Sequence, residues 1–196
     1  MQRIHDYGKS QGYVLPSLYQ GYYNAVSRRC EKELFPMLRR LNIAFYRYSP
    51  LGAGWFTLSP EAIREGKEGR FDTRDMEGLV YQAMFIKPSY LAALESWARL
   101  ANQSGLVPAE LALRWINFHS VLRSERGDGI ITSAENPTQL KELLGWRAKG
   151  GMEKWVVDAV DAIWASCEHE AALDCVNGWF DDVKHGRVVP PKGMEY

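Results

Sequence analysis

Residues 48–54, YSPLGAG, place an aromatic side chain directly before a turn of small residues. Tyr48 ends an apolar run, and the carboxyl end of a parallel strand lies at the face of the sheet where ligands bind. Small residues such as Gly52 and Gly54 let backbone N–H groups approach a phosphate. Both features have ordinary alternatives, because Tyr48 could pack in a core and most glycine-containing turns only reverse the chain.

A second group of reactive residue types, Cys167, His169 and Cys175, does not predict a metal site. The spacing C-x-H with a distant cysteine matches no familiar four-ligand pattern, so we expect ordinary surface and helix-end residues. His119 lies beside the apolar stripe of an expected helix, where packing or a local hydrogen bond is favoured over catalysis. We therefore predict no metal.

Composition limits the classes of function. The 196 residues carry 24 Lys and Arg against 24 Asp and Glu, so the net charge is zero, and we expect no nucleic-acid partner. No apolar stretch is long enough to cross a membrane, and the first twelve residues do not resemble a signal peptide. Three scattered cysteines predict no disulfide framework, which favours a cytoplasmic location.

Three short apolar runs are expected to be strands, and helical segments separate them. The expected strands are residues 13–19, 42–48 and 130–132. Pro16 argues against a fully paired central strand in the first of them. Strands separated by helices indicate an α/β fold with a parallel sheet. Residues 171–196 have no such pattern, and we expect a loosely ordered tail after a domain of residues 1–170.

Helices are predicted from apolar stripes and end signals. The expected starts are Ser27, Ser89, Pro108 and Asn136, after a first helix that ends at Gly12. The stripes that we expect to be buried are Cys30, Leu34, Leu38 and Leu41; Tyr90, Leu94, Trp97 and Ala101; Leu111, Trp115, Phe118 and Leu122; Leu140, Leu143 and Leu144; and Val156, Val160, Ile163 and Trp164. Pro36 should bend or divide its helix. Residues 49–88 are expected to be a long loop with a short helix near 60–65.

Five motifs in a fixed order carry a resemblance to a known family. They are YQ-x-x-YN, E-x-ELFP-x-LR, YSPL-x-x-G, GRF and LRW-x-x-x-HS, within residues 19–120, followed by GDGIITSAENPTQLKELL at 127–144. Together they resemble the aldo-keto reductases of the aflatoxin-aldehyde-reductase type, over some 85% of the chain, up to about residue 169. The resemblance implies a (β/α)8 barrel that reduces aldehydes or ketones with NADPH. The similarity covers its C-terminal half, a partial TIM barrel of strands six to eight with their helices.

The resemblance also implies which residues bind NADP(H). Gln20 matches the glutamine that orients the nicotinamide carboxamide, and Tyr48 matches the aromatic residue that stacks on the nicotinamide ring. Arg70 matches an arginine of a loop that folds over the cofactor, although alone it would more often be a solvated charge. The full implied set is Gln20, Tyr48, Ser49, Pro50, Leu51, Gly52, Gly54, Ser59, Arg70, Ser133, Ala134, Glu135, Gln139 and Glu142.

Three residues differ from the family pattern: two of them belong to this set, and the third lies next to Glu142. Glu135 replaces a small hydroxyl residue near the ribose 2′-phosphate, Leu143 replaces an asparagine that contacts adenine, and Ser59 replaces a lysine of the pyrophosphate loop. Each lost or repulsive contact would cost on the order of 1–3 kcal/mol of binding energy. The resemblance therefore predicts weak NADP(H) binding.

The family's catalytic tyrosine, with its aspartate, lysine and histidine helpers, belongs to segments that these residues do not match. We expect no catalytic residue in this chain, and a small-molecule carbonyl substrate only if a catalytic half is supplied. Alternatively, the chain is a non-catalytic dinucleotide-binding or interaction module. Three strands cannot close a barrel, so we expect the apolar faces around Val14, Leu18, Ile43, Phe45 and Ile130 to meet water. Self-association or capture of a complementary half-barrel would cover them.

Overall fold

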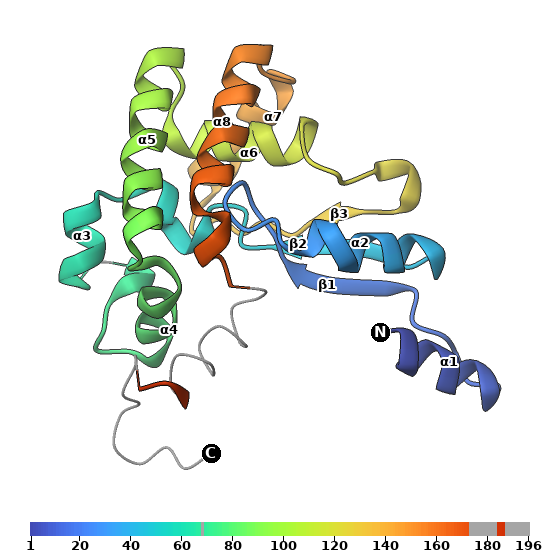
Figure 1. Ribbon diagram of the computed structural model, residues 1–196. Coiled ribbons are helices and arrows are strands. Elements are labelled where there is room, and N and C mark those ends of the chain that lie inside the picture. Colours follow the sequence, from blue (N-terminus) through green and yellow to red (C-terminus); the bar gives the residue numbers. More distant parts are fainter. Residues whose placement is uncertain (68, 173–183, 187–196) are drawn as a thin grey trace.

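Helices and three short strands make up the computed structural model, which describes residues 1–67, 69–172 and 184–186 (Figure 1). In chain order the elements are α1 (Gln2–Ser10), β1 (Leu18–Tyr22), α2 (Cys30–Arg40), β2 (Ala44–Tyr48), α3 (Pro60–Glu65), α4 (Met76–Phe85), α5 (Pro88–Ser104), α6 (Pro108–Phe118), β3 (Gly129–Ile130), α7 (Pro137–Ala148) and α8 (Lys154–Cys167). The predicted tail falls largely on residues outside these ranges. None of the described helices is long and apolar enough to cross a membrane.

The strands form one parallel sheet in the order β1-β2-β3, which agrees with the α/β prediction. The described strands do not close into a barrel. Residue pairs Leu18–Ala44 and Tyr22–Tyr48 mark the ends of the β1–β2 ladder, and Tyr46 is level with Gly129 of β3. The carboxyl ends of all three strands therefore lie at the same end of the sheet.

The first strand begins later than predicted. Residues 13–17 are outside β1, which starts at Leu18, and Val14 is 98% exposed. Pro16 accounts for this difference, since proline cannot donate a ladder hydrogen bond. Pairing begins just beyond it, where the N–H of Ala44 donates to the carbonyl of Ser17 at 3.0 Å.

The apolar faces expected to meet water do so only in part. Leu18 is 42% exposed, whereas Ile43 and Phe45 are buried, so the expectation was wrong for these two residues. Successive side chains of a strand point to opposite faces, and Phe45 points toward α2, where its ring lies 4.6 Å from that of Phe35. The exposed face of the sheet carries Tyr46 instead.

Helix α2 begins at Cys30, and not at a cap formed by Ser27. Ser27 instead belongs to a tight turn in which its N–H donates to the carbonyl of Asn24 at 3.1 Å. Arg29 occupies the cap position without a side-chain hydrogen bond. Pro36 lies inside α2, which remains one helix and is not divided.

The segment predicted as a long loop is mostly ordered into short helices. The 3₁₀ helices η1 (Gly52–Thr57) and η2 (Gly69–Phe71) alternate with α3 and α4. Periodicity missed them because aromatic packing holds them in place: Trp55 stacks on Phe85 at 5.6 Å between ring centroids, and Phe56 packs on Trp97 at 4.4 Å. The short helix predicted near 60–65 is confirmed as α3.

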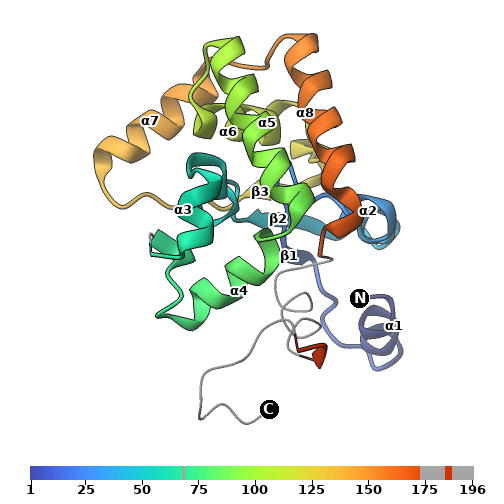
Figure 2. The same cartoon turned by 60° about the vertical axis from the view of Figure 1, so that its left-hand side comes forward.

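Helices α5 and α8 pack side by side, with α6 beside them (Figures 1 and 2). The stripe predicted for α5 is confirmed, because Tyr90, Leu94, Trp97 and Ala101 are all buried. In α8, Val156, Val160 and Ile163 are buried as predicted, and Trp164 is partly buried.

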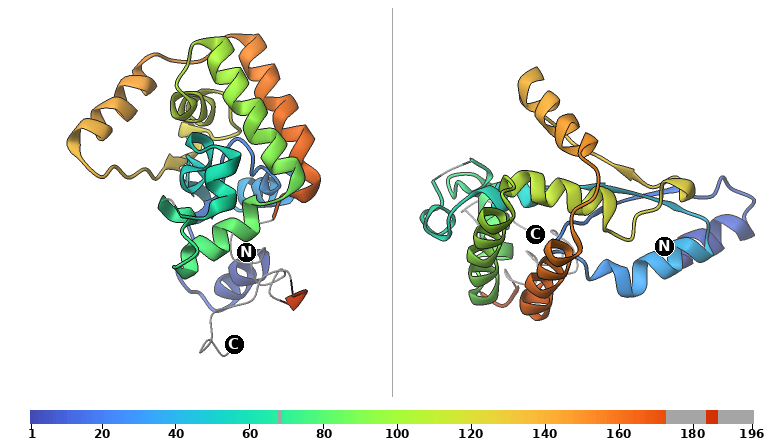
Figure 3. Two further views of the ribbon diagram at one scale, coloured as in Figure 1. Left: turned by 90° about the vertical axis from the view of Figure 1, so that its left-hand side faces the viewer. Right: turned by 90° about the horizontal axis from the view of Figure 1, so that it is seen from above.

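Helix α7 projects away from the rest of the chain (Figure 3). Its start at a capping Asn136 is confirmed, but only Leu143 of its three predicted inward leucines is buried. Leu140 and Leu144 are 43% and 55% exposed. The prediction fails for these two because α7 contacts mainly α6, and no described element covers its remaining apolar side. In α6, Phe118 is also exposed, contrary to its predicted burial.

Candidate functional site

Most of the residues predicted to bind a cofactor lie at or beyond the carboxyl ends of β2 and β3. Residues 23–29 follow β1, residues 49–59 follow β2, and residues 131–136 lead from β3 to α7. In parallel α/β sheets this end of the strands is where ligands bind, because loops from adjacent strands converge there. The sheet therefore positions the two predicted segments after β2 and β3 at the same end, whereas the segment after β1 contains no predicted residue.

Gln20 and Tyr48 lie on the same face of adjacent strands. In the β1–β2 ladder Gln20 is level with Tyr46, and Tyr22 is level with Tyr48. Gln20 therefore lies two residues short of the level of Tyr48 but on the same face, because every second side chain of a strand points to the same side. Gln20 is exposed in the middle of β1, two residues before the strand ends at Tyr22. Tyr48 is half-buried, and its ring lies 5.7 Å from that of Tyr22. Part of the Tyr48 side chain therefore packs against Tyr22, and part of it stays accessible.

The turn after β2 begins with a residue in the left-handed region. Ser49 has φ 56°, which is uncommon for a residue other than glycine and is maintained here by its surroundings. The buried side chain of Asn24 donates to the Ser49 carbonyl at 3.3 Å and accepts from the N–H of Val26 at 3.0 Å. Asn24 thereby joins the ends of β1 and β2. It ends the motif YQ-x-x-YN, but sequence reasoning did not select it.

Further along this turn, three successive residues have a positive φ. Gly52, Ala53 and Gly54 have φ of 57°, 59° and 97°. A Cβ atom added at Gly54 would meet nothing within 4 Å, so the side of the turn at Gly54 is open. Pro50 and Leu51 are half-buried. An open turn with reversed backbone can direct N–H groups toward an anion.

Arg70 is exposed on η2, and its guanidinium lies 3.5 Å from a carboxylate oxygen of Glu77. Arg70 and Ser49 both interact with Tyr81 of α4, which sequence reasoning missed. Burial and then the charge of Glu77 raise the pKa of Tyr81, while hydrogen bonds with Arg70 and Ser49 oppose the rise. Tyr81 therefore links the turn after β2 to Arg70, which the resemblance assigns to a loop that folds over the cofactor.

Ser59 caps α3 in this structure. Its hydroxyl accepts from the N–H of Ala62 at 3.1 Å, in the ordinary geometry of a helix start. This local role explains a serine at the position without reference to a ligand.

The segment between β3 and α7 carries Ser133, Ala134 and Glu135, of which Ser133 and Glu135 are exposed. Gln139 is engaged locally, because its side-chain oxygen accepts from the N–H of Glu135 at 2.6 Å. Glu142, one turn further along α7, is exposed. These residues therefore lie around the start and first turns of α7, and the side-chain oxygen of Gln139 is already engaged by Glu135.

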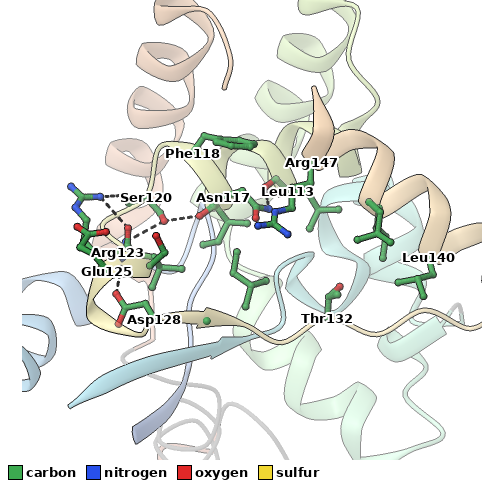
Figure 4. A pocket seen from close by; sticks show the side chains of 17 residues that line it. Leu113, Asn117, Phe118, Ser120, Arg123, Glu125, Asp128, Thr132, Leu140 and Arg147 are labelled. Atoms are coloured by element: carbon green, nitrogen blue, oxygen red, sulfur yellow. Dashed lines mark hydrogen bonds between the residues drawn. The ribbon is translucent and has the colours of Figure 1, made fainter. Parts of the chain in front are cut away.

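A cavity of about 660 Å³ lies elsewhere, between α6, the turn before β3, and α7 (Figure 4). None of the predicted cofactor residues lines it. Its lining includes Leu113, Leu140 and Leu144, together with Ser120 and Asp128. Leu143, which stands at the position of the family's adenine-contacting asparagine, does line it, so the cavity adjoins the predicted adenosine end of the site.

His119 has the local role that was predicted for it. Its Nε2 accepts from the N–H of Met152 at 2.7 Å, which requires a neutral ring nitrogen. Burial, followed by the nearby charge of Arg114, lowers its pKa despite the opposing charge of Asp161. Among the described residues no group of three His, Cys, Asp or Glu side chains could hold a metal ion, and Cys175 lies outside them.

The Aldo/keto reductase family matches this chain over residues 1–165. The chain is 39% identical to oxidoreductase sirO of Leptosphaeria maculans over 87% of its own length and 52% of that protein. It is 36% identical to human aflatoxin B1 aldehyde reductase member 2 and 34% identical to an aldo-keto reductase of Pseudocercospora fijiensis, covering 83% and 80% of this chain and 47% and 53% of those proteins. It therefore spans about half the length of the curated relatives it matches. By this match and the order of its motifs, the chain belongs to the aldo/keto reductase family.

Proposed function

We propose that this chain supplies the NADP(H)-binding part of an oxidoreductase that acts on aldehyde or ketone groups. In this proposal β1, β2 and β3 correspond to strands six to eight of a (β/α)8 barrel, within residues 1–170. The observation that supports the proposal is that two predicted cofactor segments, residues 48–54 at the end of β2 and residues 133–135 beyond β3, follow adjacent parallel strands at the same end of the sheet.

The residues at the turn after β2 fit the nicotinamide and pyrophosphate parts of the cofactor. Tyr48 and Gln20 lie on the same face of the sheet. The nicotinamide ring could stack on Tyr48 there, and its carboxamide could form a hydrogen bond with the side-chain amide of Gln20. The open side of the turn at Gly54 allows close approach, and Arg70, which interacts with Tyr81 as Ser49 of the turn does, carries a positive charge. When bound, NADPH supplies a hydride for reduction of a carbonyl carbon; the residues named here bind and orient it.

The adenosine end fits less well. Gln139 already accepts a hydrogen bond from Glu135, and the exposed Glu135 carboxylate would repel a 2′-phosphate placed near it. Glu142 is accessible for a contact with adenosine. We therefore propose NADP(H) as the cofactor with weak affinity, bound chiefly through its nicotinamide and pyrophosphate portions.

Relatives named for their reactions support the substrate class. Two have names that describe aldehyde reduction or oxidoreductase activity, and a third is aldo-keto reductase pigE of Monascus ruber, 33% identical over 78% of this chain. We propose a carbonyl compound of specialised metabolism as the substrate, processed in the cytoplasm, with the proton donor supplied by a catalytic half outside these residues.

Titration of the chain with NADPH, followed by cofactor fluorescence or calorimetry, tests the binding proposal. Tyr48→Ala should weaken binding about 5- to 30-fold, since aromatic stacking contributes roughly 1–2 kcal/mol. Glu135→Ser should strengthen binding by removing repulsion. Glu95→Ser removes an exposed carboxylate from α5 and should leave affinity unchanged. Equal affinities for the Tyr48 variant and the unaltered chain would contradict the proposed site.

Turnover by the chain alone is expected to be undetectable. His119 Nε2 already accepts a hydrogen bond from the Met152 N–H, and none of the matched motifs contains the family's catalytic tyrosine, which would donate a proton to the carbonyl oxygen. The measurement is the loss of NADPH absorbance with 4-nitrobenzaldehyde, with the protein-free mixture as control. Saturable, protein-dependent loss would show that this chain contains a catalytic acid.

A further inference from the structure

The side chain of Asn24 connects the turn after β1 with the turn after β2. It is fully buried, and a buried amide requires hydrogen-bond partners. Its oxygen accepts from the N–H of Val26 at 3.0 Å, and its nitrogen donates to the carbonyl of Ser49 at 3.3 Å. Because β1 and β2 pair with each other, this connection joins the ends of two neighbouring strands and does not involve an outer edge of the sheet.

The turn that carries Asn24 is itself held in place. Residues 22–28 are all buried. The N–H of Ser27 donates to the Asn24 carbonyl at 3.1 Å, and the hydroxyl of Tyr90 on α5 donates to the carbonyl of Val26 at 2.7 Å. The Asn24 amide is therefore fixed in one position, from which it can determine the orientation of the carbonyl that it binds.

Ser49, which receives this hydrogen bond, has a conformation that needs support. Its φ of 56° lies in the left-handed region, which is unfavourable for a residue with a Cβ atom. The Ser49 carbonyl also accepts from the N–H of Gly52 at 3.1 Å, so its orientation determines how the following turn begins. Without the Asn24 amide, the extended conformations that a serine prefers would compete with the left-handed one.

The backbone of Ser49 sets the direction of the proposed cofactor turn. Tyr48 directly precedes it, and the positive-φ residues Gly52, Ala53 and Gly54 follow it. A rotation at Ser49 would move these residues relative to the Tyr48 ring, so the ring and the turn would no longer face the same ligand. Asn24 is buried and hydrogen-bonded at both ends of its amide, so it acts on a ligand only through Ser49.

We infer that Asn24 is a positioning residue of the cofactor site: its amide holds Ser49 in the left-handed conformation and thereby orients residues 49–54 toward the pyrophosphate of NADP(H). The inference rests on the proposed cofactor function and adds to it a residue that does not touch the ligand. The motif YQ-x-x-YN then contributes twice to the site, since Gln20 faces the nicotinamide and Asn24 sets the turn of the neighbouring strand.

Titration of variants with NADPH tests the inference. Asn24→Ala lets Ser49 return to extended conformations, and the apparent affinity falls with the fraction of chains that remain competent to bind. We expect binding about 5- to 20-fold weaker than that of the unaltered chain. Asn24→Asp keeps the acceptor for Val26 but removes the donor to Ser49, and it should weaken binding at least as much. Asn102→Ala removes an exposed asparagine of α5 and should leave the affinity unchanged.

A second substitution separates positioning from a general loss of structure. Glycine adopts the left-handed region without strain, so in a chain that also carries Ser49→Gly the loss caused by Asn24→Ala should be less than about 2-fold. Loss of the Ser49 hydroxyl affects both members of this pair equally. Ser59→Gly is the matched control, because Ser59 has φ −86° and gains no such relief, so the full loss should persist beside it. Circular dichroism at the titration temperature verifies that each variant is folded.

The outcomes separate this inference from the proposed function. Rescue by Ser49→Gly and not by Ser59→Gly would support the positioning role of Asn24, which a merely structural role would not produce. Equal losses with and without Ser49→Gly would overturn the inference, as would an unchanged affinity in Asn24→Ala when Tyr48→Ala weakens binding; both results leave the proposed cofactor site standing. No binding of NADPH by the unaltered chain would overturn both.

Discussion

Replacing Asp128 by alanine is expected to lower the free energy of unfolding by about 3–5 kcal/mol, because it breaks a buried ion pair with several further hydrogen bonds. The side chain of Asp128 is wholly buried. Its carboxylate accepts two hydrogen bonds from Arg39 of α2, one from the N–H of Phe45 at 2.9 Å, and one from the N–H of Arg123 at 2.8 Å. One carboxylate therefore joins α2, β2 and the turn before β3.

Urea unfolding followed by tryptophan fluorescence measures the effect. Asp128→Asn, which retains the shape but not the charge, should lose less stability than Asp128→Ala. Asp158→Ala is the matched control, since Asp158 is exposed and forms an ion pair with Lys154 one turn away on α8, and it should change stability by less than about 0.5 kcal/mol. A loss below about 1 kcal/mol for Asp128→Ala would contradict the proposed role.

The same carboxylate predicts a pH dependence. Burial would raise the pKa of Asp128, but the hydrogen bonds from Arg39, Arg123 and Phe45 outweigh it and hold the pKa below its usual 3.8. A carboxyl group with a lowered pKa in the folded state stabilises the fold above its unfolded pKa and loses this contribution as pH falls through the folded value. The unaltered chain should therefore lose stability as the pH falls below about 4. Asp128→Ala has already lost this contribution, so its free energy of unfolding should fall less over the same pH range.

Local pattern was enough to predict most of the helices and the parallel sheet. The stripe of α5 and the capped start of α7 follow from spacing and end chemistry, which are properties of neighbouring residues. The pairing of Arg39 with Asp128, 89 positions apart, is not a local property and was not predicted. Apart from α3, which was predicted, the short helices within residues 49–88 were missed for the same reason, because aromatic contacts between segments hold them.

The candidate site divides in the same way. The resemblance implied that Tyr48, Arg70 and Gln139 belong to one site; Tyr48 ends β2, Arg70 lies on η2, and Gln139 lies on α7, which follows β3. Asn24 and Tyr81 were missed because their roles consist of contacts with Ser49 and Arg70 that only the folded chain creates. The binding roles themselves remain predictions for the NADPH titration.

Arg47 is the buried charge whose removal should stabilise the chain. It lies in the central strand, level with Gly21 of β1 and Ile130 of β3, and its side chain is fully buried. Within the described part of the chain none of its three guanidinium nitrogens has a hydrogen-bond partner. Burial lowers the pKa of Arg47 to about 9, and the nearby Tyr23 only partly opposes this shift. An unpaired charge in such a place opposes folding.

Arg47→Met should therefore raise the free energy of unfolding by about 1–4 kcal/mol at neutral pH, because an apolar chain of similar length occupies the site without the desolvation cost. Arg47→Lys keeps the charge and should give no gain. Arg99→Met removes an exposed arginine from α5 and should change stability by less than about 0.5 kcal/mol. Urea unfolding of the three variants beside the unaltered chain provides the comparison.

The pH dependence of this gain has a definite sign. A cation whose pKa is lowered in the folded state binds its proton more tightly when unfolded, so the stability of the unaltered chain rises with pH above about 9. Arg47→Met lacks this group, and its advantage should shrink as the pH is raised from neutral through that value. A gain that stays constant over this range would attribute the effect to packing and not to charge. No gain at any pH would mean that the guanidinium reaches solvent or an anionic partner in solution, and the central strand would then not contain an unpaired charge.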